Sequence, residues 1–241
     1  MWDKIFKEDL EMYKYEMHLH TMPVSACARA TVRENLEFYK ELGYDGVFIT
    51  DHFIDGNLNI DKSCPYEERI RFYYSSYREA LEIGSEIGIR VFSGVEMSYL
   101  GTDFLVYGLD EKWWLEHPEI EGLQKSKQLP LLRESGGFVA QAHPYRQDRW
   151  IDHIRLFPSC VDAVEVTNAC RKDFDNAMAD AYADAYELLK IGGTDNHVGR
   201  KVKRLAGIMT ETPIADEADM IQRIRDGKVK IFLEDNPFFE D

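Results

Sequence analysis

The stretch Val47-Phe48-Ile49-Thr50-Asp51-His52 runs from three large apolar residues directly into an aspartate and a histidine. A short apolar run of this kind is typical of a strand buried on both faces. Metal-ligand residue types also follow apolar runs at His18-Leu19-His20, Glu96, His143 and Asp195-Asn196-His197. The strands of a parallel barrel deliver side chains to one rim, where such folds carry out their chemistry. The pattern therefore predicts a barrel enzyme that binds metal ions.

Helical segments separate the apolar runs. Residues 31–42 have helical apolar spacing with Thr31 as the expected N-cap, and Gly88 is expected to end a long helix over 66–87. Further helices are expected at 122–134, 173–189 and 217–226. Strands are expected at 15–20, 47–49, 89–95, 104–107, 138–142, 161–166, 191–195 and 205–209. This alternation predicts a parallel α/β sheet covered by helices, closed into a barrel, in a single domain over residues 1–241.

Composition limits the classes of function. The 241 residues carry 29 basic and 44 acidic side chains, a formal charge of -15, which argues against binding to long nucleic acid or an anionic membrane. The sequence has no run of roughly 20 apolar residues, the length that crosses a bilayer. The four cysteines show no CxxC spacing, and the first five residues lack the apolar core of a secretion signal. We therefore expect a cytoplasmic protein.

Spacing within the motifs favours a shared site. Because side chains alternate along a strand, His18 and His20 point to the same face, and Asp195 and His197 repeat that geometry. The two oxygens of the Glu96 carboxylate can bridge two cations. A mixed histidine and carboxylate set suits zinc, manganese or iron better than calcium, which prefers oxygen ligands.

Two neighbouring residues are expected to orient the imidazoles. Pro144 restrains the backbone of His143, and Asp51 is a candidate partner for the second ring nitrogen of His52. Glu165 is expected to orient a ligand or the substrate, and a helix-capping role for this segment is the alternative.

In their order along the chain, five motifs resemble those of the PHP (polymerase and histidinol phosphatase) family. They are His18-Leu19-His20-Thr21, Thr50-Asp51-His52, Gly94-Val95-Glu96, Ala142-His143-Pro144 and Gly193-Thr194-Asp195-Asn196-His197. The resemblance implies a distorted, seven-stranded (βα) TIM-like barrel. It also implies a phosphoesterase site with two or three divalent metal ions.

The same resemblance assigns roles to the ligands. Glu96 would bridge two ions, and one of these would be completed by His18, His20 and Asp195. His143 would serve the other ion. His52 and His197 would hold a third ion, or contact the phosphate when no ion is there.

The sequence departs from the family pattern at two places. A histidine or aspartate often follows the first motif and helps to hold the third metal, but here only Ser25 and Cys27 are available. Of these two, Cys27 is the one able to bind zinc when ionised. The family commonly has a histidine where Asp103 stands, and aspartate remains a competent ligand for manganese or iron.

These features predict hydrolysis of a small phosphomonoester by a metal-bridged hydroxide, with a histidinol-phosphatase-like reaction as one possibility. Glu96 would be catalytic as the bridge, and His52 or His197 would protonate the leaving oxygen. Residues expected near the phosphate are Arg29, Arg146, Asn168, Arg171 and Arg200.

Three alternatives stay open at this stage. The chain can be a phosphodiesterase or exonuclease on short nucleotides, a non-catalytic metal-binding PHP domain, or a metal barrel that hydrolyses a cyclic amide. The last commonly uses a carbamylated lysine as its bridge, whereas Glu96 occupies that place here. The sequence leaves the natural substrate, the metal and the oligomeric state undetermined.

Overall fold

The structure is a computed structural model that describes residues 12–240. Its strands are β1 (Tyr13–Leu19), β2 (Gly46–Ile49), β3 (Arg90–Tyr99), β4 (Thr102–Tyr107), β5 (Phe138–Ala142), β6 (Ala163–Asn168), β7 (Leu189–Gly193), β8 (Arg204–Thr210) and β9 (Lys230–Asp235). Within the described range they form one sheet of nine strands in the order β7-β6-β5-β4-β3-β2-β1-β8-β9. Residues 1–11 and 241, which the single-domain prediction includes, lie outside the described residues.

The sheet curls until β7, at one end of the strand order, approaches β1 at one rim. Leu19 forms an isolated parallel bridge with Asn196, just beyond β7. The N–H of His20 donates to the carbonyl of Asn196 at 3.1 Å, and the N–H of Asp195 donates to the carbonyl of His18 at 2.9 Å. The predicted α/β barrel is therefore confirmed as a nearly closed, barrel-like sheet, although the described residues contain nine strands rather than seven.

The expectation of a parallel sheet is wrong for two strands, β4 and β8, which run against the other strands. β4 runs antiparallel to both β3 and β5, β8 runs antiparallel to β1, and β9 runs antiparallel to β8. Only Leu100 and Gly101 separate β3 from β4, and their φ values of 49° and 84° fit a tight hairpin turn. A parallel connection needs a dozen or more residues. The link between β7 and β8 is likewise too short for a crossover helix.

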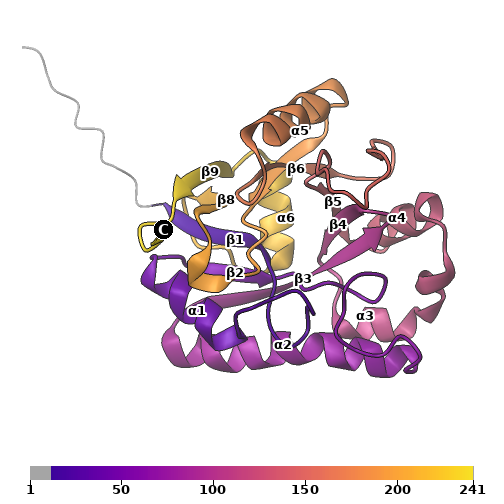
Figure 1. The fold of residues 1–241 in the computed structure, drawn as a ribbon, viewed down its shortest axis with the longest axis horizontal. Coiled ribbons are helices and arrows are strands. Elements are labelled where there is room, and N and C mark those ends of the chain that lie inside the picture. Colours follow the sequence, from indigo (N-terminus) through magenta and orange to yellow (C-terminus); the bar gives the residue numbers. More distant parts are fainter. Residues whose placement is uncertain (1–11, 241) are drawn as a thin grey trace, which may run out of the picture.

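Helices cover the sheet on its outer side. They are α1 (Val32–Glu41), α2 (Tyr66–Ile87), α3 (Glu111–Glu116), α4 (Lys125–Glu134), α5 (Asp173–Ala185) and α6 (Glu217–Arg225), with short 3-10 helices η1 (Pro118–Gly122) and η2 (Gly199–Lys201). Figure 1 shows the strands at the centre, α1 and α2 along one side, and α5 on the other. None of the helices in residues 12–240 is both long and apolar enough to span a membrane.

The predicted helix ends are confirmed where local chemistry specifies them. Thr31 caps α1 in a reciprocal capping box with Glu34, which satisfies backbone N–H groups that the first turn leaves unpaired. Gly88 ends α2 in the left-handed conformation, with φ of 73°, which glycine adopts without a steric penalty. These caps place both helices against the strands that carry site residues.

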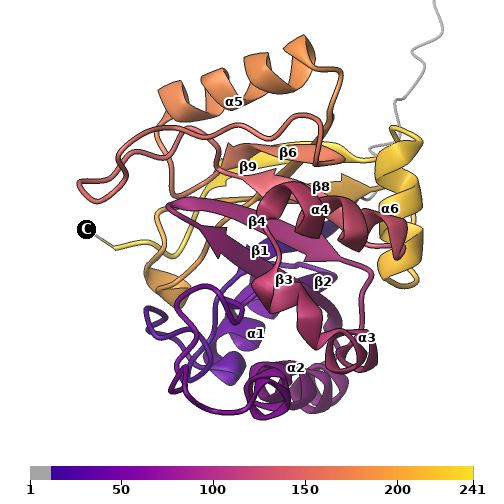
Figure 2. The same cartoon turned by 90° about the vertical axis from the view of Figure 1, so that its right-hand side faces the viewer.

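α6 closes the end of the barrel opposite the rim. Met220 and Ile224 of α6 belong to one buried cluster with Tyr15, Phe92 and Phe138, which lie in the first halves of their strands. Figure 2 shows α6 standing at one end of the strands. Burying an apolar side chain of this size contributes about 1.5–3 kcal/mol, so this end is packed apolar core. The polar site residues lie at the opposite rim.

Candidate metal centre

The predicted metal ligands converge on the barrel rim that lies opposite α6. His18 lies near the end of β1, His143 directly follows β5, and Asp195 lies shortly beyond β7. Glu96 in β3 and Asp103 in antiparallel β4 reach the same rim because a hairpin joins their strands. A strand that runs backwards can therefore still contribute a ligand, from its first residues rather than its last.

One cluster of ligand atoms surrounds His18. Its Nε2 lies 3.1 Å from His20 Nε2, 3.1 Å from Glu96 Oε1 and 3.6 Å from Asp195 Oδ1. His20 Nε2 lies 3.4 Å from Asp195 Oδ1. All four side chains are buried. The structure thus brings together the two imidazoles and two carboxylates that the resemblance assigned to one ion.

A second cluster shares Glu96 with the first. His143 Nε2 lies 3.4 Å from Glu96 Oε1 and 3.8 Å from Asp103 Oδ2. The ligand atoms of Glu96, Asp103 and His143 all lie within 4.8 Å of one another. Since Glu96 Oε1 faces both His18 and His143, this carboxylate has the position of a bridge.

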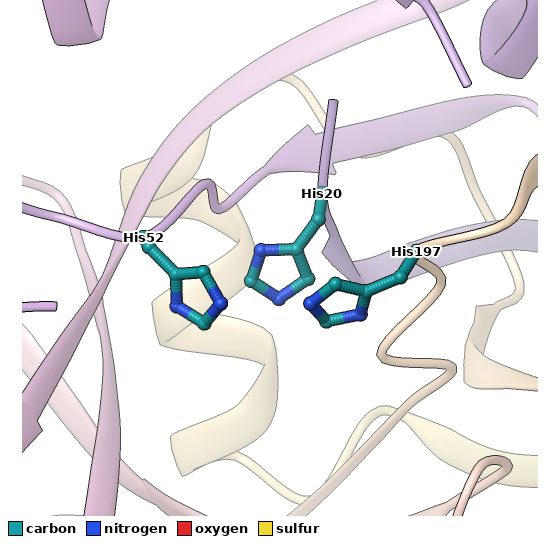
Figure 3. A group of neighbouring side chains, drawn as sticks. All are labelled: His20, His52 and His197. Carbon is teal, nitrogen blue, oxygen red and sulfur yellow. The ribbon is translucent and has the colours of Figure 1, made fainter. Parts of the chain in front are cut away.

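The third group consists of His20, His52 and His197. Figure 3 shows the three rings side by side, with one nitrogen of each turned toward the others. One ligand atom from each lies within 4.8 Å of the other two. Cys27 borders this group, because its Sγ lies 3.1 Å from His52 Nε2.

Unpaired buried atoms indicate that these residues fit metal ions. Glu96 Oε2, Asp103 Oδ2, His143 Nε2 and His52 Nδ1 are buried and have no hydrogen-bond partner. Glu96 Oε2 lies only 2.6 Å from His52 Nδ1, yet the two atoms are not aligned for a hydrogen bond. A buried polar atom without a partner is costly, and metal ions among these ligand atoms would satisfy all four.

The pKa shifts of Glu96 and His20 favour the forms of these side chains that bind a cation. Burial opposes ionisation of Glu96, but the imidazoles of His52 and His18 outweigh it and hold the carboxyl pKa well below its usual range. Burial, reinforced by His197 and His52, holds the pKa of His20 well below its usual range. His20 is therefore neutral, with a lone pair available for a metal.

The Cys27 thiol is also perturbed. Burial opposes its ionisation, but hydrogen bonds from His197 and His52 outweigh burial and lower the pKa of Cys27 to about 6. The thiolate is therefore the main form at neutral pH, and the thiolate is the form that binds metals.

Glu165 orients two ligands, which is one of the two roles expected for it. Glu165 Oε1 lies 2.9 Å from His18 Nδ1, and Oε2 accepts the backbone N–H of His143 at 3.0 Å. Asn168, predicted to contact the phosphate, instead donates its amide to Glu165 at 2.9 Å and accepts from the N–H of Cys170 at 3.0 Å. Its observed partners are thus protein groups behind the ligands.

Asp51 does not orient His52 as expected. Its carboxylate accepts hydrogen bonds from Thr21, Ser25 and Ser76, and no contact joins it to the His52 ring among the described interactions. Ser25 in turn accepts the backbone N–H of His52 at 2.9 Å. Asp51 therefore fixes the segment after the first motif and bonds to Ser25, which accepts the His52 N–H.

Glu16 is a buried carboxylate at the centre that none of the predicted motifs included. This fully buried carboxylate accepts N–H groups of His18 and Thr194, each at 2.8 Å, and the hydroxyl of Tyr39 at 2.8 Å. It thereby joins the two chain segments that carry His18 and Asp195. Strand alternation was the available signal, because Glu16 shares a face with His18 and His20.

The predicted arginines separate into two pairs. Arg171 Nη2 lies 2.7 Å from Asp195 Oδ2, and Arg146 Nη1 lies 3.0 Å from Asp103 Oδ2. Both arginines line a cavity of about 320 Å³ beside the metal ligands, and the Nε of each is buried without a hydrogen-bond partner.

Arg29 and Arg200 line a different cavity. The exposed Arg200 pairs with Glu41 and stacks on Phe238, so its observed contacts lie away from the histidines. Arg29 reaches the site through its backbone, since its N–H donates to the carbonyl of His197 at 2.7 Å. The structure does not bring these two guanidinium groups to the metal ligands.

A family model described as PHP-associated matches residues 174–229, a segment that includes Asp195 and His197. A comparison with curated protein sequences gives no match. The family match thus covers the later part of the barrel.

Several solved structures share the fold. A two-domain protein from Bacteroides vulgatus that contains a predicted PHP-like metal-dependent phosphoesterase matches with a TM-score of 0.69 and 14% identity, over 92% of this chain. The present chain spans 65% of that protein. A candidate metal-dependent phosphoesterase from Bifidobacterium adolescentis matches with a TM-score of 0.55 and 14% identity, over 78% of this chain and 88% of its own length.

An amidohydrolase from Chromobacterium violaceum, solved with sulfate and without metal, matches with a TM-score of 0.51 and 15% identity over 90% of this chain and 97% of its own. Likeness at such identities establishes the fold and leaves the reaction to be argued from the site. The partial match to the PHP-associated model and the shared fold agree with the resemblance of the sequence motifs to the PHP family.

Proposed function

We propose that this chain is a metal-dependent phosphoesterase that hydrolyses a small phosphomonoester. One observation carries the proposal: buried histidines and carboxylates converge around Glu96 beside two arginines with unpaired Nε atoms. The structurally similar proteins described as metal-dependent phosphoesterases support the same reaction class.

The ligand residues would divide between two ion positions that share Glu96. When bound, paired divalent ions lower the pKa of a bound water and neutralise charge on phosphate oxygens. One position would be held by His18, His20, Glu96 and Asp195, and the other by Glu96, Asp103 and His143. Glu165 keeps Nε2 of His18 free for this role by occupying its Nδ1.

Arg146 and Arg171 are the proposed phosphate-binding groups. Each already contacts a ligand carboxylate, so both guanidinium groups border the ligand clusters. A guanidinium binds phosphate oxygens through two parallel hydrogen bonds, which would satisfy the unpaired Nε atoms. Their cavity is therefore the proposed entrance for the ester.

The size and charge of the site favour a small substrate. The cavity of about 320 Å³ also borders Lys172 and Phe174, a mixture of cationic and apolar surface suited to a phosphorylated metabolite. This volume lies at the lower end of the roughly 300–1,000 Å³ of small-molecule sites. The net charge of -15 disfavours a long nucleic acid.

The leaving oxygen needs a proton, and His52 and His197 are its candidate donors when they are not ligands. Burial opposes protonation of His197, but Asp195 and Cys27 outweigh it and raise its pKa to about 10. Without an ion in the third group, His197 is therefore protonated at neutral pH and able to donate.

The test compares p-nitrophenyl phosphate, bis(p-nitrophenyl) phosphate and a cyclic amide, with protein loaded with manganese or zinc. We expect preferential hydrolysis of the monoester, loss of activity with a chelator and recovery when metal is returned. A panel of phosphorylated metabolites, followed by release of inorganic phosphate, would then define the substrate. Preference for the diester or the amide, or no turnover of any of these, would contradict the proposal.

A further inference from the structure

The segment between β1 and α1 holds Cys27 firmly beside the third histidine group. Cys27 Sγ lies 3.1 Å from His52 Nε2, and the His197 side chain also forms a hydrogen bond with it. Backbone bonds fix both neighbours of Cys27, because Ala28 N donates to Ser25 O at 3.1 Å and Ala26 N to Asn57 O at 3.0 Å. The thiol is thus placed by the fold and partly shielded from solvent.

The surroundings of Cys27 have the composition of a metal site. The three imidazoles of the group offer nitrogen atoms within 4.8 Å of one another, and His20 among them is fully buried. Cys27 Sγ contacts His52 Nε2, whereas Glu96 Oε2 lies 2.6 Å from the other ring nitrogen, Nδ1, so an ion beside Cys27 would bind His52 through Nε2. A sulfur next to two imidazoles is a ligand combination found at zinc sites.

We propose that Cys27 supplies a thiolate ligand to a third metal position formed with His52 and His197, and that this position prefers zinc to manganese. Thiolate is a soft ligand that selects zinc-like ions, whereas manganese favours oxygen ligands. As the sulfur donates an electron pair to the ion, the thiol proton leaves to solvent, so binding releases a proton when the thiol starts protonated. The inference depends on metal binding by the proposed centre and not on turnover.

This arrangement also assigns His52 and His197 a role. As ligands they are unavailable to protonate the leaving oxygen, whose proton then comes from solvent. The third position would differ from the other two, whose anionic ligands are carboxylates. Zinc and manganese would therefore distribute unequally over the centre.

The test loads the intact protein with Co²⁺, which reports a thiolate ligand by a near-ultraviolet charge-transfer band. We expect the wild type to show the band, and Cys27→Ser to lose both the band and one equivalent of bound metal. Cys27→Asp, which replaces sulfur with a carboxylate, should regain the equivalent without the band. Cys64→Ser is the matched control, because Cys64 lies just before α2 and outside the ligand groups, and this variant should leave both readouts unchanged.

A cobalt-loaded wild type without the band, or a band that persists in Cys27→Ser, would overturn the inference. Recovery of the metal equivalent in Cys27→Asp shows that the serine variant lost a ligand rather than its fold. A wild type that shows the band but hydrolyses no phosphate ester would refute the proposed activity and leave this inference standing. A wild type that hydrolyses phosphate esters but shows no band would refute this inference and leave the proposed activity standing.

Discussion

Glu165 Oε1 lies 2.9 Å from His18 Nδ1, and both side chains are fully buried. The second oxygen of the same carboxylate accepts the backbone N–H of His143 at 3.0 Å. One acidic side chain therefore orients two proposed metal ligands from different strands. A carboxylate behind a ligating imidazole fixes the direction of the ring and raises its basicity.

We expect Glu165→Gln to weaken metal binding by about 10- to 100-fold, the usual cost of losing such a partner. A competitive titration with a chromophoric chelator measures this change. Asp180→Asn, at an exposed residue paired with Lys190, is the control and should bind metal like the wild type. Unchanged affinity in Glu165→Gln would show that the carboxylate does not act through His18.

Because Gly193 has no side chain, it leaves room for the side chains of His18 and Glu165. A Cβ at this position would lie 2.6 Å from His18 Cβ and 2.7 Å from Glu165 Oε1. Gly193→Ala should therefore displace both side chains, weaken metal binding and cost roughly 1–3 kcal/mol of stability. Gly122→Ala provides the control, since an added Cβ there meets nothing within 4 Å. Chemical denaturation and metal titration of both variants check the expectation, and equal behaviour would contradict it.

Arg171 is expected to bind the phosphate group. Removing one charged hydrogen-bond donor costs about 1.5–3 kcal/mol, so Arg171→Ala should lower kcat/KM by roughly 10- to 100-fold, mainly through a higher KM. Steady-state kinetics with a phosphomonoester measure the effect. Arg78→Ala, which removes a surface partner of Glu111, should keep wild-type kinetics. Retention of the wild-type KM by Arg171→Ala would remove this residue from the phosphate site.

A pH-dependent contribution to stability is expected away from the metal centre. Hydrogen bonds from Arg69 outweigh burial and hold the pKa of Glu121 below its ordinary value. The folded state thus releases this proton at lower pH than the unfolded chain does. The pair should stabilise the fold above the ordinary glutamate pKa, and this stability should be lost as pH falls through the lowered value.

Glu121→Gln should accordingly reduce the free energy of unfolding by about 1 kcal/mol or less at neutral pH, because the 42% exposed side chain is screened by solvent. The difference from wild type should shrink in acid. Chemical denaturation of the wild type and of Glu121→Gln at neutral and at acid pH tests this expectation. Glu82→Gln, on the exposed face of α2, is the control. A difference that stays constant or grows in acid would be the contrary result.

Much of the centre could be predicted from the sequence because its ligands follow apolar runs. His18, His143 and Asp195 come at or just after strands whose burial is visible in the residue pattern, and strand ends gather at one rim. Helix ends were equally readable, since Thr31 and Gly88 carry local capping chemistry. Local signals of this kind depend on few residues.

Properties that depend on tertiary contacts could not be read in the same way. The backward direction of β4 follows from a turn at Leu100 and Gly101, where leucine gives no sign of a positive φ. β9 was missed because Ile231, Phe232 and Leu233 are flanked by charged residues in a half-exposed edge strand. Arg200 was assigned to the rim from its place in the chain, whereas a surface carboxylate, Glu41, holds it elsewhere.

The most direct test of the centre is the metal content of the wild type and of Glu96→Gln after loading with manganese or zinc and removal of excess ion. The shared position of Glu96 predicts about two or three ions per wild-type chain. In Glu96→Gln it predicts fewer ions and no turnover, with an unchanged circular dichroism spectrum. A wild type that retains no stoichiometric metal, or a Glu96→Gln variant with wild-type metal content and activity, would contradict the account.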